Sequence, residues 1–538
     1  MRQHLMKAAA AFLALSAMAS QSWAAGQASG QGDLVVQTDG GAVRGAVALG
    51  VENFLDIPYA APPVGALRWQ PPQPPEAWKG IRSAATYGHY CTQPKSFDSP
   101  AGAALNEDCL DINVQRPIGT RADANLPVYV YIHGGGFVTG SGVKDGQDKI
   151  VRLNGIVGVT MSYRLGAMGF LALPSLATAS GETGDYGLLD QQAALRWVQR
   201  NIARFGGDPR KVTIGGESAG GWSVCTHLVA PGSRELFSQA IIESGACVSV
   251  PLAKAEAEGA AFAAKLGCGA ASGQAACLRA KPVAAILAAQ APVYFPKRDT
   301  PFLPIDTWHA IQTGNFAHVP VIVGSNRDEG RSFTHADVGW SKAQYEAFVR
   351  ASFGAQAGSV LKLYPYPAGD HDPAAVAYQV AAINTDDGTL VGQGVVNAEI
   401  GGCGNLALTE ALARYVPVYA YEFEHRAGPG WFATPGYQWG AGHAAELTYL
   451  YPQHDGGKGY AGFTPAEVAL SDEMVRYWGD FVKRADPNGA GQPNWPAYSQ
   501  GQFLSLDVGG KTAATANAAF VSEHHCTFWN RLTGTTIK

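Results

Sequence analysis

Short, nearly continuous apolar runs alternate along this sequence with longer segments of helical periodicity, and this alternation constrains the fold most strongly. Runs that are rich in β-branched residues and bounded by turns are typical of parallel strands covered on both faces. The predicted strands are Val128–Ile132, Val157–Tyr163, Val212–Ile214, Ala240–Ile242, Val321–Val323 and Val418–Tyr421. The pattern therefore predicts an α/β protein with a large, mostly parallel central sheet and helices on both faces.

Two helices can be located from sequence signals. The segment Leu188–Phe205 has helical periodicity. A later helix begins with Thr464 as N-cap, Pro465 in the first turn and Glu467 completing a capping box, and it should end near Arg484. No linker of low complexity divides the chain, so we expect residues 25–538 to form a single domain.

Residues 1–24 are typical of a secretory signal peptide. Arg2 and Lys7 precede a twelve-residue apolar stretch, Ala8–Ala19, and Ser22 and Ala24 are small residues at a cleavage site. The stretch is too short to cross a bilayer, which needs about 20 apolar residues. We expect an exported protein, periplasmic or secreted, without a membrane anchor.

The composition excludes several classes of protein. A hydrophobic content of 46% and a charged content of 15% exclude a disordered chain. A net charge of −5 makes nucleic acid an unexpected partner. The eight cysteines are an even number without the close C-x2-C spacing of a zinc site, and in an exported chain they indicate disulfides, of which 105 complete pairings are possible.

The pentapeptide Gly216-Glu217-Ser218-Ala219-Gly220 follows a predicted strand and precedes a segment that can begin a helix. In this context G-x-S-x-G indicates a nucleophile elbow, where a tight turn holds a serine hydroxyl clear of the backbone. The bare pattern is weak evidence in a chain with 66 glycines, so the strand–turn–helix context carries the prediction.

A second glycine motif, His133-Gly134-Gly135-Gly136-Phe137, follows the predicted strand Val128–Ile132. An HGGG-type loop can direct backbone N–H groups at a single oxygen atom, and the residue after a serine nucleophile adds a further donor. Two motifs that each follow a predicted strand indicate acyl-transfer chemistry more strongly than either does alone.

Two segments resemble nucleotide-binding motifs, but each lacks a feature that the motif requires. Residues 457–462 match G-x-G-x-x-G but follow no predicted strand, and the segment that ends in Lys511-Thr512 has Ser505 where a P-loop needs its first glycine. We interpret both segments as turns.

The chain resembles the type-B carboxylesterase/cholinesterase family of the α/β-hydrolase superfamily. Besides the two glycine motifs, the matching segments are Phe54–Ala60, Glu107–Val114, Ser162–Phe170, Gly184–Leu189 and Phe205–Pro209. The resemblance covers nearly the whole mature chain. It implies an α/β-hydrolase fold with insertions that form a gorge, and a carboxylesterase that hydrolyses small-molecule esters without a metal or cofactor.

The resemblance also implies a catalytic triad, in which the acid and the base follow the serine. Ser218 would be the nucleophile, Glu329 the acid and His443 the base, with Gly135, Gly136 and Ala219 as the oxyanion hole. Asp328 is the local rival of Glu329. Glu217 is expected to be an electrostatic neighbour of the site.

Two further residues are expected near the site. Glu446, three residues after His443, is expected to support the site rather than to bind a metal. Ser244 is expected to lie nearby, with its role open.

The family pattern implies the disulfides Cys91–Cys109, Cys268–Cys277 and Cys403–Cys526. Cys225 and Cys247 are then left over, and either a fourth disulfide or two buried thiols remain possible.

The loop between Cys91 and Cys109 contains Phe97 but no tryptophan, which argues against a choline ester as substrate. We expect a bulky organic ester, of the kind hydrolysed by para-nitrobenzyl or fumonisin esterases. The segment Pro292–Pro304, with Lys297 and Arg298, could favour a large or partly anionic ester. The alternative function is a catalytically inactive, cholinesterase-like adhesion module.

Overall fold

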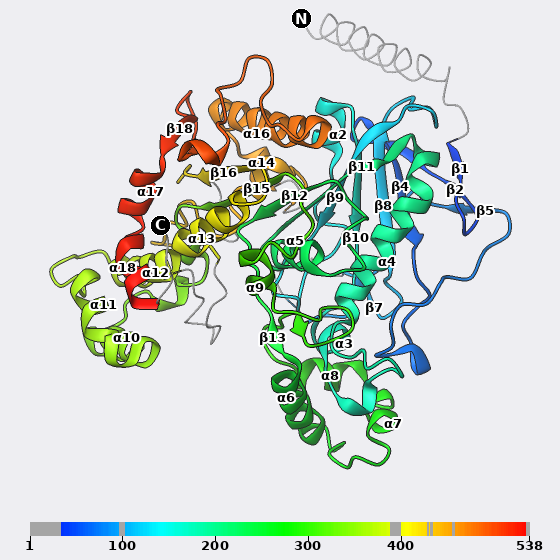
Figure 1. Cartoon of the computed structure of the whole chain (residues 1–538), viewed down its shortest axis with the longest axis horizontal. Helices are drawn as coiled ribbons and strands as arrows, with labels where there is room; N and C mark the ends of the chain where they lie inside the picture. Colours follow the sequence, from blue (N-terminus) through cyan, green and yellow to red (C-terminus); the bar gives the residue numbers. More distant parts are fainter. Residues whose placement is uncertain are drawn as a thin grey trace, which may run out of the picture.

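In the part of the chain that the structure describes, a sheet of eleven strands runs through the centre of the molecule (Figure 1). The structure is a computed structural model that describes residues 34–95, 103–387, 400–427, 430, 434–454 and 458–533. Across the sheet the order is β18 (Ala513–Ala516), β17 (Gln502–Leu506), β16 (Val418–Phe423), β15 (Val321–Asn326), β12 (Gln239–Glu243), β11 (Gly207–Glu217), β9 (Leu126–Ile132), β10 (Val157–Met161), β8 (Asp111–Pro117), β4 (Val51–Pro58) and β3 (Ala46–Ala48).

The middle of the sheet is parallel, from β10 through β9, β11, β12, β15 and β16 to β17. The two margins are antiparallel: β8 pairs with β10 and β4, β4 pairs with β3, and β18 pairs with β17. The predicted mostly parallel sheet is therefore confirmed. The carboxyl ends of the parallel strands all lie at one edge, where the functional loops of such sheets lie.

Successive strand residues enter two different hydrophobic cores. On β9, Val128, Val130 and Ile132 pack on one face, whereas Tyr129 and Tyr131 pack on the other. Because side chains alternate along a strand, both faces must be covered, and the apolar runs are continuous for this reason. Residues of α4, α5 and α13 complete the first core, and residues of α2, α14 and α16 complete the second.

The remaining elements cover the sheet or extend from it (Figure 1). The helices are α2 (Asp148–Asn154), α3 (Gly166–Phe170), α4 (Tyr186–Asn201), α5 (Ala219–Val229), α6 (Leu252–Lys265), α7 (Gln274–Arg279), α8 (Val283–Ala289), α9 (Thr307–Gln312), α10 (Lys342–Phe353), α11 (Ala357–Leu363), α12 (Ala375–Asp387), α13 (Gly402–Ala413), α14 (Leu447–Leu450), α15 (Lys458–Ala461), α16 (Pro465–Arg484), α17 (Asn517–Glu523) and α18 (Cys526–Thr533). Short strands outside the main sheet are β1 (Val35–Gln37), β2 (Ala42–Arg44), β5 (Ile81–Ser83), β6 (Tyr90–Cys91), β7 (Leu105–Asn106), β13 (Val250–Pro251) and β14 (Lys297–Arg298). Within the described residues, no helix is long and apolar enough to cross a membrane.

The two predicted helices are confirmed. The segment predicted from residue 188 to residue 205 forms α4 and a following 3-10 turn, Ile202–Phe205. At α16, the Thr464 hydroxyl accepts a hydrogen bond from the Glu467 N–H, and the Glu467 carboxylate accepts one from the Thr464 N–H at 2.7 Å. This reciprocal capping satisfies N–H groups that a helix start otherwise leaves unpaired.

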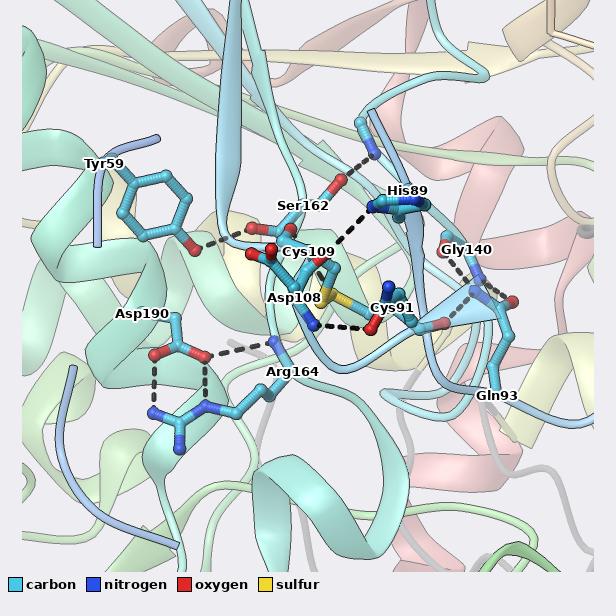
Figure 2. Close-up of a disulfide and its surroundings, with 12 residues drawn as sticks. Tyr59, His89, Cys91, Gln93, Asp108, Cys109, Gly140, Ser162, Arg164 and Asp190 are labelled. Carbon is cyan, nitrogen blue, oxygen red and sulfur yellow. Dashed lines mark hydrogen bonds and ion pairs between the residues drawn. A yellow bond between two sulfur atoms is a disulfide. The ribbon is translucent and has the colours of Figure 1, made fainter. Parts of the chain in front are cut away.

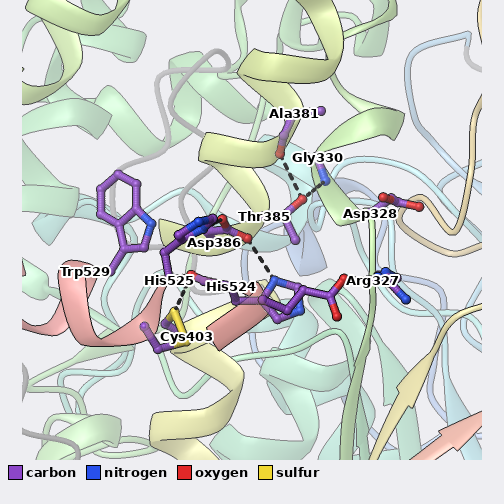
Figure 3. Close-up of polar contacts among 12 residues, drawn as sticks. Arg327, Asp328, Gly330, Ala381, Thr385, Asp386, Cys403, His524, His525 and Trp529 are labelled. Atoms are coloured by element: carbon purple, nitrogen blue, oxygen red, sulfur yellow. Dashed lines mark hydrogen bonds and ion pairs between the residues drawn. A yellow bond between two sulfur atoms is a disulfide. The ribbon is translucent and has the colours of Figure 1, made fainter. Parts of the chain in front are cut away.

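A buried histidine ties the C-terminal helices to the sheet. His524, between α17 and α18, contacts Asp386 of α12 through Nδ1 at 2.8 Å and Glu422 of β16 through Nε2 at 2.6 Å. Figure 3 shows His524 beside Asp386, with the neighbouring His525 at the same carboxylate. Burial by itself lowers the pKa of His524, but the attraction of Glu422 and Asp386 outweighs it and raises the pKa to about 10.

We predict that His524→Asn destabilises the fold by about 3–5 kcal/mol, because it leaves two buried carboxylates without their cation. The matched control is His525→Asn, whose side chain is 42% exposed and should cost less than about 1 kcal/mol. Thermal and urea unfolding measure both variants. Because the folded pKa is raised, the stabilisation is complete below about pH 6.5 and is lost as the pH rises through about 10, so the deficit should narrow over that interval. Equal deficits for the two variants would contradict this role.

Candidate active site

Ser218 occupies a strained turn between β11 and α5. Its backbone has φ 57° and ψ −124°, a region that non-glycine residues rarely adopt and that costs on the order of 1–3 kcal/mol. The Ser218 N–H donates to the Glu243 carbonyl at 3.0 Å, and its carbonyl accepts from the Trp222 N–H at 2.9 Å. The predicted strand–turn–helix context of the elbow is therefore present.

The two glycines that flank the elbow allow a close approach of backbones. A Cβ on Gly220 would lie 2.0 Å from the Ile132 carbonyl oxygen, and one on Gly216 would lie 2.6 Å from the backbone of Gly220. Such contacts exclude any side chain at either position. The motif glycines are thus required by the packing of the elbow against the end of β9.

The HGGGF loop lies directly against the elbow. A Cβ on Gly134 would lie 3.0 Å from the Ser218 Cβ, so the predicted donor loop and the predicted nucleophile are neighbours. Gly135 and Gly136 have φ values of 98° and 62°, which favour glycine. Ala219 is the first residue of α5. The three predicted oxyanion-hole residues therefore lie in the two segments that meet at Ser218, which are the HGGGF loop and the start of α5.

Gln93, two residues after Cys91 of the Cys91–Cys109 disulfide, holds the backbone that follows the HGGGF loop (Figure 2). The Gln93 side-chain amide donates to the Gly140 carbonyl at 2.9 Å and accepts from the Gly140 N–H at 3.0 Å. The same amide donates to the Cys91 carbonyl at 3.0 Å. The disulfide anchors the backbone at Cys91, and the Gln93 amide connects that backbone to Gly140, which follows the HGGGF loop. Phe97 lies outside the described residues.

Glu329 is a buried carboxylate with three donors. It begins a 3-10 turn, Glu329–Ser332, directly after β15. Its Oε1 accepts from the Asn326 N–H at 2.7 Å and from the Ser244 hydroxyl at 2.5 Å, and its Oε2 lies 2.6 Å from His443 Nδ1. This arrangement orients the carboxylate toward His443, as an orienting acid requires.

Helices α12 and α13 hold the Glu329 turn from behind. The Thr385 hydroxyl of α12 accepts from the Gly330 N–H at 2.9 Å and donates to the Ala381 carbonyl at 2.8 Å (Figure 3). A Cβ on Gly401, before α13, would lie 2.6 Å from the Glu329 side chain. The turn is therefore packed as well as hydrogen-bonded.

Asp328, the local rival, has a different role. Its carboxylate accepts two hydrogen bonds from Arg426, at 2.7 and 2.8 Å, and one from the Ala441 N–H at 3.1 Å. It thus supports the loop that precedes His443, and it is Glu329 whose carboxylate contacts the imidazole.

His443 lies between two carboxylates. Its Nδ1 is 2.6 Å from Glu329 Oε2, and its Nε2 is 3.0 Å from Oε1 of Glu217, the residue before Ser218. Burial lowers the pKa of His443, but the attraction of Glu217 and Glu329 outweighs this effect and raises the pKa well above its usual value. Glu217 was expected to be an electrostatic neighbour of the site. The structure shows that it is also in direct contact with the imidazole.

Glu446, three residues after His443, is a further buried carboxyl group near the site. Glu446 is fully buried, and its carboxylate accepts a hydrogen bond from the Asn326 side-chain amide. Burial and the nearby charges of Glu217 and Glu329 raise the pKa of Glu446 well above its usual value. The protonated, neutral form of Glu446 is therefore favoured relative to that of a solvent-exposed glutamate.

The cysteines form four disulfides in the described residues: Cys91–Cys109, Cys225–Cys247, Cys268–Cys277 and Cys403–Cys526. Three are the pairs that the resemblance implied, and the fourth joins the two cysteines whose state was open. Among the residues that the structure describes, no three histidine, cysteine or acidic side chains are grouped so as to hold a metal ion.

Sequence reasoning missed some supporting residues and left one role open. The open role was that of Ser244, whose hydroxyl donates to Glu329, while Asn326 and Gln93 were not singled out at all. Asn326 stands three residues before Glu329, so its local hydrogen bond could have been suspected. Gln93 lies 47 residues from its partner Gly140, and no local pattern connects the two.

The chain is similar to known proteins in its sequence and in its fold. The sequence model of the carboxylesterase family matches residues 32–529. Cocaine esterase from Homo sapiens is 34% identical over 514 residues, which cover 91% of this chain and 88% of that protein. Fumonisin B1 esterase from Sphingopyxis macrogoltabida is 33% identical over 503 residues, which cover 88% and 86% respectively. The solved structure of PNB esterase matches with a TM-score of 0.75 and 30% identity, over 92% of this chain and 100% of that chain.

The fold and the family match define a carboxylic ester hydrolase with the α/β-hydrolase fold. This chain belongs to the carboxylesterase family.

We predict that Glu217→Gln moves the acid limb of the kcat/KM profile to lower pH by about 1 to 3 units. A base must be neutral to accept a proton, and the Glu217 carboxylate favours the protonated imidazole at 3.0 Å. Removing that charge lowers the pKa of His443. The matched control is Glu410→Gln on α13, whose side chain contacts Tyr498 and should leave the profile unchanged. An unmoved acid limb in Glu217→Gln would contradict the electrostatic role of Glu217.

Proposed function

We propose that the protein is a serine esterase that forms an acyl-enzyme on Ser218. The observation that carries this proposal is the 2.6 Å contact between His443 Nδ1 and Glu329. The same imidazole also contacts Glu217, which belongs to the elbow. In the proposed mechanism, an imidazole oriented in this way by a carboxylate activates the weak nucleophile Ser218.

In the proposed reaction, His443 removes the Ser218 hydroxyl proton as the oxygen attacks the ester carbonyl. The backbone N–H groups of Gly135, Gly136 and Ala219 stabilise the oxyanion of the tetrahedral intermediate. His443 then gives the proton to the leaving alcohol, and water releases the acid from the acyl-enzyme in the same way. Glu329 stays ionised, holds the tautomer and stabilises the imidazolium.

The proposed substrate is a bulky organic ester whose alcohol part carries no charge, rather than a choline ester. The support comes from the absence of tryptophan between Cys91 and Cys109, since a quaternary ammonium is best held by aromatic faces. The similarity to fumonisin B1 esterase and PNB esterase over most of the chain supports a bulky organic ester.

We also propose that residues 1–24 are removed on export to the periplasm or the medium, leaving one catalytic domain from residue 25. The four disulfides support an oxidising compartment. The proposed signal peptide lies outside the described residues.

We predict that Ser218→Ala lowers kcat for an aryl ester by a factor on the order of 10⁴ to 10⁶ without changing the unfolding midpoint. An organophosphate should add one mass equivalent to the wild type, located on Ser218 by peptide mass spectrometry, and none to the variant. Retained turnover would place the nucleophile elsewhere. A wild-type protein that neither reacts nor hydrolyses would favour the adhesion module.

We predict no preference for butyrylcholine over 3,3-dimethylbutyl butyrate, which has the same shape without the charge. A ratio of the two kcat/KM values near or below one is expected, because a cation–π cage would contribute about 0.5–2 kcal/mol to the charged ester. A preference of about tenfold or more for butyrylcholine would overturn this substrate assignment.

A further inference from the structure

A cavity of about 540 Å³ lies between α6 and the segment that leads into β14. Side chains of α3, α6 and residues 289–297 line it, and its walls are predominantly apolar. Ser218, His443 and the glycines of the oxyanion loop are not among its lining residues. The cavity is thus a compartment beside the proposed catalytic site and not the site itself.

The wall that separates the two is one segment thick. The Tyr294 N–H donates to the Gly136 carbonyl at 3.2 Å, and a Cβ on Gly136 would lie 3.6 Å from Val293. Phe295, from the same segment, packs on Trp222 of α5 with ring centroids 5.2 Å apart. Residues 293–295 therefore face the proposed catalytic site on one side and the cavity on the other.

Lys297 places a buried ammonium group at this cavity. The residue is 3% exposed, and its Nζ makes no hydrogen bond within the part of the chain that the structure describes. The ammonium lies 4.7 Å from the centre of the Phe170 ring and 5.5 Å from that of Tyr294, and both rings line the cavity. Cation–π contacts compensate only part of the cost of burying an ammonium group, so hydrogen-bonding capacity remains for a ligand.

The charges around the cavity favour an anion. Its lining contains three lysines, Lys254, Lys265 and Lys297, against one carboxylate, Glu258. The other nearby acid is Asp185, whose carboxylate accepts hydrogen bonds from the Lys297 backbone N–H at 3.1 and 3.2 Å. Burial raises the pKa of Asp185 to about 8, which disfavours its charged form beside the cavity, and it lowers the pKa of Lys297 to about 8.

We propose that this cavity binds a carboxylate-bearing amphiphile, with the carboxylate on the Lys297 ammonium and the hydrocarbon part against the apolar walls. Two kinds of molecule could supply such a carboxylate. One is a free carboxylic acid, such as the product of ester hydrolysis, and the other is an ester that carries a second, ionised carboxyl group. A cavity of this size accommodates a ligand of drug-like dimensions.

The first experiment measures binding without catalysis, so it does not rest on the proposed function. Octanoate and its neutral isostere octanamide are titrated into Ser218→Ala by calorimetry. Octanoate should bind more tightly than octanamide, and Lys297→Met in the same background should weaken octanoate binding by about tenfold or more. The matched control, Lys254→Met, removes an exposed lysine from the rim and should have a small effect.

A second variant covers the case in which Lys297→Met fails to fold. Ala261→Trp fills the cavity from its exposed rim and leaves the ammonium in place. It should also abolish octanoate binding. Octanoate binding that is equal in Ala261→Trp, Lys297→Met and the parent protein would overturn the proposal.

The second experiment separates the two sources and rests on the proposed ester hydrolysis. We compare kcat/KM for 4-nitrophenyl octanoate and for the mono-4-nitrophenyl ester of suberic acid. A loss of about tenfold in Lys297→Met for the suberate alone identifies the carboxyl-bearing ester, whereas unchanged kinetics with weakened octanoate binding identifies the free acid. If Ser218 is not the nucleophile, turnover persists in Ser218→Ala while octanoate binding is unaffected, so the two proposals fail separately.

Discussion

The site depends on the interaction of one imidazole, that of His443, with two buried carboxylates, Glu217 and Glu329. Burying Glu217 and Glu329 beside His443 would be costly without compensation, and the protein compensates through Asn326, Ser244 and the imidazole itself. Burial and the same negative surroundings raise the pKa of the neighbouring Glu446. The result is an imidazole with a raised pKa and a fixed orientation, enclosed by groups that leave it little freedom to rotate.

This enclosure is possible because the parallel strands end together. The HGGGF loop follows β9, the elbow follows β11, Ser244 follows β12 and the Glu329 turn follows β15, and these four strands are neighbours in the sheet. The helices that cover the sheet add the support: α12 holds the Glu329 turn through Thr385, and the Cys91–Cys109 loop holds the oxyanion loop through Gln93. A further layer, the His524 contacts with α12 and β16, fixes the C-terminal helices to this framework.

Lys297 is another buried charged group, and it lies away from the proposed catalytic centre. A buried cation with no hydrogen bond in the described residues is costly, and the proposed ligand would supply the missing hydrogen bonds one segment away from the HGGGF loop. The sequence drew attention to this lysine only as part of an aromatic and basic segment. Its burial between Phe170 and Tyr294, and the cavity beside it, come from the packing of α3, α6 and the residues before β14.

The sequence by itself determined what is local: six strands of the parallel sheet, the capped start of α16, the elbow and the HGGGF loop, because short-range backbone requirements fix each of them. It also proposed Glu329 and His443 through a family resemblance, and the structure places these two side chains in contact. Only the tertiary structure decided that Glu217 touches His443, that Ser244 and Gln93 hold their partners, and that Cys225 pairs with Cys247. Those contacts join residues from different strands and loops, and their distances depend on how the whole sheet and its helices pack, which no local pattern encodes.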